Sequence, residues 1–255
     1  MTSPPDPSTS ALFLNSIYFL AEWKTPFSDE LNTDGAFYTN ENETVNTTYM
    51  LGLLDNIPYV EAKDYRLICL PYKNNDLGMY IIYPNENNPY KYNLKEFSEK
   101  LDPSELLDTI TKTKLRSVVV QIPKLSLSNK LTLLEPLQKY AEFKKTNLNI
   151  KDGNFIDNIA NNIQNFKNFT PQATSDIFLT GAAKNANFRI SNIVQQMVFS
   201  INEKGTEAAA VTSGLTDNMG GSKTMVITRP FAFFIRHEAT LATIFWGTIM
   251  DPSQN

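Results

Sequence analysis

Short apolar runs separated by turn-forming residues dominate the first third of the chain. Residues 11–19 (ALFLNSIYF) are apolar on both faces, which is typical of a strand buried inside a sheet. Further strands are predicted at 36–38, 45–51, 58–61, 65–70 and 79–83. Turns recur about every 8–12 residues, a spacing that predicts an all-β layer or barrel-like sheet.

The middle of the chain changes to helical spacing. Leu94, Phe97 and Leu101 predict a short helix over 93–101, and the leucines and isoleucine of 103–113 predict a second one. Residues 117–122 are β-branched and are interrupted at Pro123-Lys124 before 125–127, which indicates a bent or double strand. Another helical candidate covers 131–143.

Residues 147–168 contain eight Asn, yet their apolar residues fall on one face of a helix. Because Asn is a poor helix former, this segment is either a marginal amphipathic helix or a loose loop. Strands return at 190–202, 225–228, 231–237 and 242–249. Strands at both ends with helices between them indicate an α+β fold.

Composition removes several classes of function. The 255 residues are 42% hydrophobic and carry a net charge of −4, whereas nucleic-acid binding needs surplus Lys and Arg. No apolar run reaches the roughly 18 residues of a membrane span. With one Cys (Cys69) and one His (His237), no intrachain disulfide can form and no zinc site of His and Cys is possible. Cys69 lies in an apolar run, so we expect a buried, unreactive thiol.

Parts of known catalytic motifs occur in the sequence, but none of these motifs is complete. His237-Glu238 opens like HExxH, but position 241 is Leu. The GGSKT run at 220–224 lacks the glycine spacing of a phosphate-binding loop. No G-x-S-x-G elbow is present, and His237 falls within a predicted strand. We therefore expect that the protein is not an enzyme, with no catalytic residue, metal or cofactor.

A stretch of small residues follows the strand at 190–202. Gly205 frees the backbone, and the small side chains of Thr206 and 208–210 could slide between two strands without overpacking. The polar tract 212–222 after them predicts an exposed loop open to proteases. By themselves, residues 203–213 favour an Ala-rich helix start capped by Thr206.

The surrounding motifs favour the loop instead. The strand at 190–202, the hinge EKGTEAAA, the loop, and then TRPFAFFI and TIFWGTIMDP resemble the C-terminal region of the serpins. Upstream, ALFLNSIYFLAEWKTPF resembles their third main-sheet strand, LPYKNNDLGMYIIYPN resembles neighbouring barrel strands, and IPKLSLSNKLTL resembles the run into the last main-sheet strand. This implies a mixed large sheet, barrel-like sheets and short helices, in a partial domain over 11–255 after a leader at 1–10, with 147–168 as an insertion.

The resemblance implies a serine protease inhibitor that acts as a suicide substrate. The resemblance also implies that its loop, about 203–224, would be cleaved and would insert as an extra strand into the main sheet. Counting from Glu203 and back from Pro230 both place the reactive bond at Met219–Gly220. The implied hinge is Glu203, Lys204, Gly205, Thr206, Glu207, Ala208, Ala209 and Ala210. The implied support for sheet opening is Asn15, Trp23, Lys124 and Glu203.

Met before the bond suits an elastase-, chymotrypsin- or subtilisin-like protease, with Lys223 as an alternative bond for a trypsin-like one. We expect a monomer that binds neither nucleic acid nor membranes. Sequons at Asn42, Asn46 and Asn168 suggest a secreted, extracellular glycoprotein whose signal peptide would lie in a missing N-terminal portion. Serpins place several helices before the point where this chain begins. The alternative is therefore a non-inhibitory or truncated relative, which would be only a protease substrate or a binding module.

Overall fold

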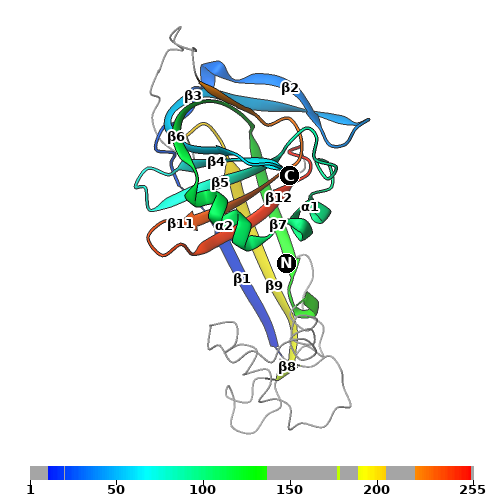
Figure 1. Cartoon of the computed structure of the whole chain (residues 1–255). Helices are drawn as coiled ribbons and strands as arrows, with labels where there is room; N and C mark the ends of the chain where they lie inside the picture. Colours follow the sequence, from blue (N-terminus) through cyan, green and yellow to red (C-terminus); the bar gives the residue numbers. More distant parts are fainter. Residues whose placement is uncertain (1–10, 20, 137–176, 179–188, 205–221, 254–255) are drawn as a thin grey trace. The chain divides into compact units, whose positions relative to one another are not determined.

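A computed structural model describes residues 11–19, 21–136, 177–178, 189–204 and 222–253. The chain divides into two compact units (Figure 1). One unit is built from residues 1–18 and 128–198, and the other from 19–127 and 199–255. The described strands form two β-sheets.

The first sheet has four strands. They are β1 (Ala11–Tyr18), β7 (Leu125–Thr132), β8 (Ile177–Phe178) and β9 (Arg189–Ile201). Their order is β1-β9-β7, with β8 also paired to β9. The strands β1 and β9 are parallel and pair directly from Ala11 opposite Ile190 to Tyr18 opposite Val198.

The prediction that 11–19 is buried on both faces is wrong. The strand forms, but the side chains of Phe13 and Leu14 are 45% and 59% exposed. Neighbouring residues of a strand point to opposite faces, so neither face is covered at this position by the described part of the chain. Apolar composition predicted the strand and not what covers it.

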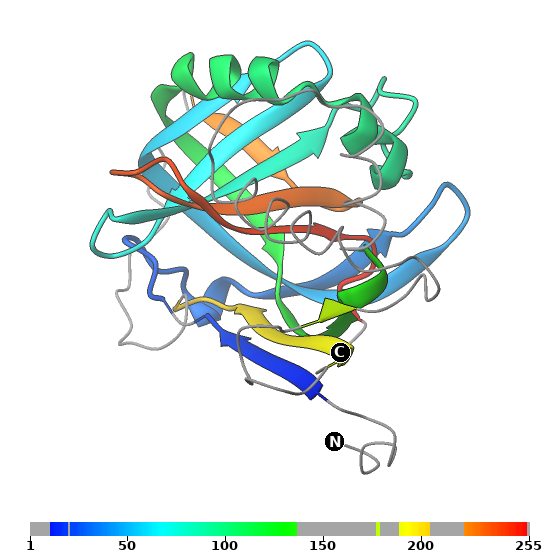
Figure 2. The ribbon, with the colours of Figure 1, turned by 90° about the horizontal axis from the view of Figure 1, so that it is seen from below.

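Among the described residues, the second sheet has eight strands and is open, with β10 and β12 at the two ends of its strand order. Figure 2 shows the ribbon from below. The order of the sheet is β10-β6-β3-β4-β5-β11-β12, with β2 paired to β3. The bounds are β2 Thr33–Tyr38, β3 Thr44–Glu61, β4 Tyr65–Pro71, β5 Leu77–Pro84, β6 Lys114–Pro123, β10 Lys223–Val226, β11 Phe231–His237 and β12 Thr243–Ile249.

Two predictions about strands need adjustment. The strands predicted at 45–51 and 58–61 form one strand, β3, with a register shift between Leu54 and Ile57. Asn56 has a φ of 57° at this shift, in the left-handed region that Asn tolerates. The chain therefore forms a bulge within one strand, where a turn between two strands was expected. The interruption at Pro123-Lys124 separates two strands, β6 and β7, which belong to different sheets.

Both helices predicted from the spacing of apolar residues are present. They are α1 (Leu94–Lys100) and α2 (Pro103–Thr111), and a 3-10 turn, η1, covers Asp29–Leu31. Each helix starts at a capping side chain: Asn93 accepts from the Glu96 N–H, and Asp102 accepts from the Ser104 N–H. Their apolar faces share a core with β4, β5 and β11, and in the described residues no helix is long and apolar enough to span a membrane.

The helix predicted at 131–143 overlaps the end of β7, which continues to Thr132. Residues 134–136 are helical, and the remainder of that prediction lies outside the described residues. The segment 147–168 and the leader 1–10 also lie outside them.

Phe233 of β11 contacts both Phe199 of β9 and the backbone of β12 at Gly247. Phe233 stacks on Phe199 with ring centroids 5.0 Å apart, and Gly247 lies opposite Phe233 in the β11–β12 pair. A Cβ at Gly247 would lie 2.8 Å from Phe233 Cε1. Gly247 is therefore required because the Phe233 ring lies against the backbone at this position, where a Cβ would clash with it.

We expect Gly247→Ala to lower the free energy of unfolding by about 1–3 kcal/mol, because Phe233 would have to leave its stack. Thr248→Ala, at the next, exposed position of the same strand, should cost less than about 1 kcal/mol. Urea unfolding followed by circular dichroism measures both values. Equal losses would show that the contact between Gly247 and Phe233 is not limiting.

Candidate functional site

The predicted hinge begins inside the described residues and leaves them after Lys204. Glu203 and Lys204 are described, whereas Gly205 to Ala210, Met219 and Gly220 lie outside. The sequons differ in the same way: Asn42 and Asn46 are exposed in the turn after β2 and on β3, and Asn168 lies outside the described residues. The structure therefore describes the site only at the two ends of the loop.

The carboxylate of Glu203 is buried and held by two side chains. Lys124 Nζ lies 2.5 Å from Glu203 Oε1, and the Asn32 side-chain amide donates to the same oxygen. The Glu203 side chain is 8% exposed and that of Lys124 is 37% exposed. Burial alone would raise the pKa of Glu203. Lys124, through its hydrogen bond and its charge, and Asn32, through its amide hydrogen bond, hold that pKa below its ordinary value.

The backbone around Glu203 is bonded to the segment that follows β1 in the chain. The Trp23 N–H donates to Lys204 O at 3.1 Å, and the Phe27 N–H donates to Glu203 O at 2.8 Å. The Trp23 indole Nε1 donates to Asn202 O at 2.8 Å, and its ring stacks on Tyr72 at 4.7 Å. We call this set the loop anchor: Trp23, Phe27, Asn32 and Lys124 holding residues 202–204.

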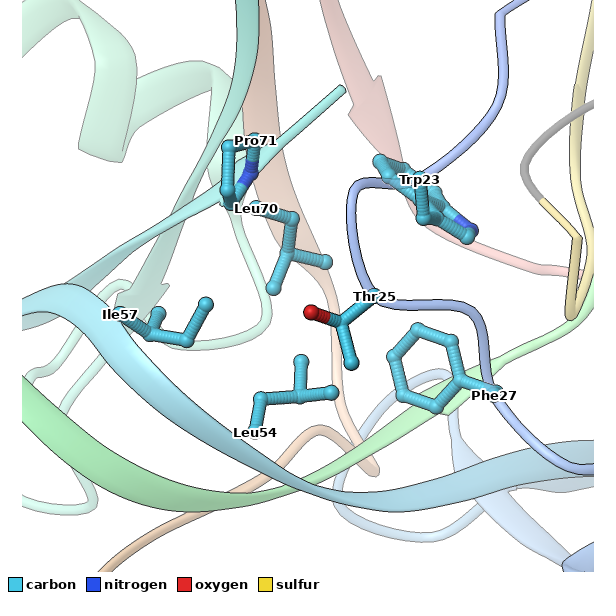
Figure 3. A pocket seen from close by; sticks show the side chains of 7 residues that line it. All are labelled: Trp23, Thr25, Phe27, Leu54, Ile57, Leu70 and Pro71. Atoms are coloured by element: carbon cyan, nitrogen blue, oxygen red, sulfur yellow. The ribbon is translucent and has the colours of Figure 1, made fainter. Parts of the chain in front are cut away.

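The space beside the loop anchor is too small for a ligand. Trp23, Thr25 and Phe27 face side chains of β3 and β4 there (Figure 3). Its volume is about 10 Å³, which is below or near that of a single water probe. The anchor is therefore a packed support and not a binding cavity.

The far end of the loop enters the eight-stranded sheet. The strand β10 pairs in parallel with β6, and Arg66 Nη1 donates to Thr224 O at 3.2 Å. Lys223 also lies 3.3 Å from Glu61 Oε1, in an ion pair exposed to solvent. Residues 205–221 thus connect two points that are both fixed in the same compact unit.

The structure brings together Trp23, Lys124 and Glu203, three of the four residues predicted to support sheet opening. The fourth, Asn15, is exposed on β1 opposite Gln195 of β9 and belongs to the other compact unit. Asn32 was missed by sequence analysis, because it lay in the turn-rich run 32–35 and no local signal distinguishes a bonded Asn from a solvated one.

The two residues that suggested chemistry have structural partners. His237 ends β11, and its Nδ1 lies 2.7 Å from Thr240 Oγ1. Cys69 is buried in β4, and desolvation raises the pKa of its thiol to about 12. Within the described ranges, no three His, Cys, Asp or Glu side chains are grouped closely enough to hold a metal ion.

Comparison with known proteins decides the family. The family described as Serpin (serine protease inhibitor) matches residues 1–252. The chain belongs to the serpin family. It is 28% identical over 253 residues to leukocyte elastase inhibitor of Bos taurus, covering 97% of this chain and 60% of the relative. It is also 28% identical to an uncharacterized serpin-like protein of Methanosarcina mazei, covering 96% of this chain and 51% of that relative.

Solved structures confirm the predicted α+β serpin fold. The native state of tengpin, a thermophilic serpin, matches with a TM-score of 0.70 and 22% identity over 98% of this chain. The chain covers 57% of tengpin, so this serpin spans a little over half the length of the proteins that it matches.

We expect Lys124→Met to lower the free energy of unfolding by about 2 kcal/mol, because it leaves the buried carboxylate of Glu203 without its cation. Lys223→Met removes the cation of the exposed pair with Glu61 and should cost at most about 1 kcal/mol. Urea midpoints compare the two variants. If the urea midpoints of both variants shift equally, the ion pair of Lys124 with Glu203 contributes no more stability than an exposed ion pair.

The same comparison should depend on pH. A carboxylate with a lowered pKa in the folded state stabilises the protein above its unfolded pKa and loses that contribution as the pH falls. The difference between wild type and Lys124→Met should be complete at neutral pH and shrink below the ordinary Glu pKa of 4.5. A difference that grows on acidification, measured by urea unfolding across this range, would contradict the assigned role of Glu203.

Proposed function

We propose that this serpin inhibits serine proteases as a suicide substrate, through cleavage and insertion of the loop at about 203–224. The observation that carries the proposal is the direct parallel pairing of β1 with β9, the strand that runs into the anchored Glu203. The place where the resemblance puts the inserted strand is therefore still closed. The loop would remain outside the sheet in this state.

Backbone hydrogen bonding favours insertion. An added strand between β1 and β9 would replace one ladder by two, while the separated edges each find a new partner. Its barrier is the separation of β1 from β9 before the new bonds form. A state that is trapped in this way stores free energy that cleavage of the loop can release.

The hinge sequence fits a strand with one buried face. Side chains alternate between the faces of a strand, so Thr206, Ala208 and Ala210 share one face and Glu207 lies on the other. Since a charged side chain disfavours burial, the small residues would face the sheet interior. Gly205 directly after the anchored Lys204 would allow the chain to change direction.

The partner would be a serine protease with an apolar primary pocket, of the elastase, chymotrypsin or subtilisin kind, cleaving at Met219–Gly220. The protease Ser would attack the Met219 carbonyl, forming the ester while the new amine of Gly220 leaves. Insertion of residues 205–219 would carry the ester away and distort the protease before water attacks it. We further propose a monomeric, secreted protein with glycans on Asn42, Asn46 and Asn168.

A second candidate is a non-inhibitory serpin that is cleaved without trapping. It is favoured by the exposure of Phe13 and Leu14 on β1. Exposed apolar side chains on β1 contribute little burial free energy to hold the sheet in a strained state. The two candidates make different predictions for one gel experiment.

Thr206→Arg should convert the inhibitor into a substrate, because a charged side chain on the buried face blocks insertion. Glu207→Arg is the matched control, because it places the same side chain on the outward face. Incubation with chymotrypsin and with elastase, followed by a denaturing gel, should show a covalent complex for the wild type and Glu207→Arg. Thr206→Arg should give at least about tenfold less complex and more cleaved chain.

Cleavage after Met219 without any complex in the wild type would favour the non-inhibitory candidate. Equal trapping by Thr206→Arg and the wild type would overturn the insertion mechanism itself. Mass spectrometry of the cleaved fragments identifies the bond and separates Met219 from Lys223.

A further inference from the structure

Two lysines bracket the loop, and no basic residue lies between them. Lys204 precedes the loop and Lys223 follows it, whereas residues 205–222 contain no Lys or Arg. A trypsin-like protease cleaves after a basic residue, because an acidic side chain at the base of its primary pocket pairs with that residue. To cut in this region, such a protease would have to use the bond after Lys204 or the bond after Lys223.

The bond after Lys204 is held by its own carbonyl group. The Trp23 N–H donates to Lys204 O at 3.1 Å, so the oxygen that a protease would have to bind in its oxyanion hole already has a partner. The preceding residue, Glu203, is buried and paired with Lys124. The residues before this bond can therefore enter a protease cleft only if the loop anchor breaks.

The bond after Lys223 lies inside a strand. Lys223 is the first residue of β10, and all of β10 pairs with β6. Arg66 Nη1 donates to Thr224 O at 3.2 Å, directly after the bond, and the side chain of Met225 is fully buried. Proteases cut exposed and locally unfolded chain, so this bond is protected as long as β10 stays in the sheet.

The side chain of Lys223 is engaged as well. Its Nζ lies 3.3 Å from Glu61 Oε1, and the Tyr59 hydroxyl donates to the same oxygen at 3.0 Å. An exposed ion pair contributes little by itself, so the backbone of β10 provides most of the protection. A trypsin-like pocket would also have to take the place of Glu61 as the partner of the ammonium group.

We propose that Lys204 and Lys223 are specificity-determining residues, whose bonds to the second compact unit withhold both basic cleavage sites from trypsin-like proteases. The loop between them offers only bonds after non-basic residues. That these bonds select the inhibited protease rests on the proposed function. The protection itself does not, because cleavage of the two bonds can be measured whether or not a covalent complex forms.

The first test compares the folded wild type with Met219→Lys under the same dose of trypsin. Mass spectrometry of the fragments gives the rate at each bond. The new bond after position 219 should be cut, or trapped as a covalent complex, at least about 100-fold faster than the wild-type bonds after Lys204 and Lys223. Synthetic peptides of residues 199–210 and 219–228 contain the same two bonds without the fold, and both peptides should be cut readily.

The second test addresses the tie at β10. Cleavage inside a folded strand follows the population of its open form, so weakening the tie should raise the rate. Arg66→Met removes the donor to Thr224 O and should speed cleavage after Lys223 about three- to tenfold. The matched control is Arg116→Met, an arginine of β6 that precedes the part paired with β10, and it should change that rate by less than about twofold.

Three outcomes of the first test would overturn the proposal. They are a difference smaller than about 100-fold between the bonds, resistance of Met219→Lys as well, and resistance of the peptides, which would assign the protection to sequence and not to the fold. Equal rates for Arg66→Met and Arg116→Met would overturn the role of Arg66. Failure to trap chymotrypsin or elastase would overturn the proposed function and would leave these cleavage rates unchanged.

Discussion

The buried carboxylate of Glu203 is the fixed point on which the rest of the site depends. A buried charge is tolerated only when it is paired and hydrogen-bonded, and Lys124 and Asn32 supply those partners. Around it, the backbones of Glu203 and Lys204 are bonded to Phe27 and Trp23. The segment after β9, which ends at Ile201, is thereby held as far as Lys204, the residue before Gly205.

The described ends of the loop, at Glu203–Lys204 and at β10, are both bonded within one compact unit, and β1 and β9 pair directly with each other. While the loop is intact, its distal end is tied to β6 through β10 and to Arg66. After cleavage, one tie is released, and the free segment could gain two ladders of hydrogen bonds between β1 and β9. The proposed inhibition therefore needs no catalytic group in the inhibitor. The protease would carry out the bond cleavage, and strand insertion into the sheet would supply the free energy.

Sequence reasoning predicted elements better than their surroundings. Phe231–His237 was predicted with the bounds that the structure gives, because its apolar run Phe231–Ile235 carries its own signal. The pairing of Lys124 with Glu203 came from resemblance, since 79 residues separate them in the chain. Three features had no local signal: the contact of Asn32 with Glu203, the bulge at Asn56 that continues β3, and the exposure of Phe13 and Leu14. Each depends on residues distant in sequence.

The central claim is that this serpin is held in a state from which its loop can enter the sheet. The most direct test is the melting temperature before and after limited cleavage of the loop by a protease that is then removed. Insertion of an extra strand predicts a rise of at least about 10 °C with the cleaved chain still associated. An unchanged or lower melting temperature after cleavage at Met219 would contradict the account, because the released segment would then have no place in the sheet.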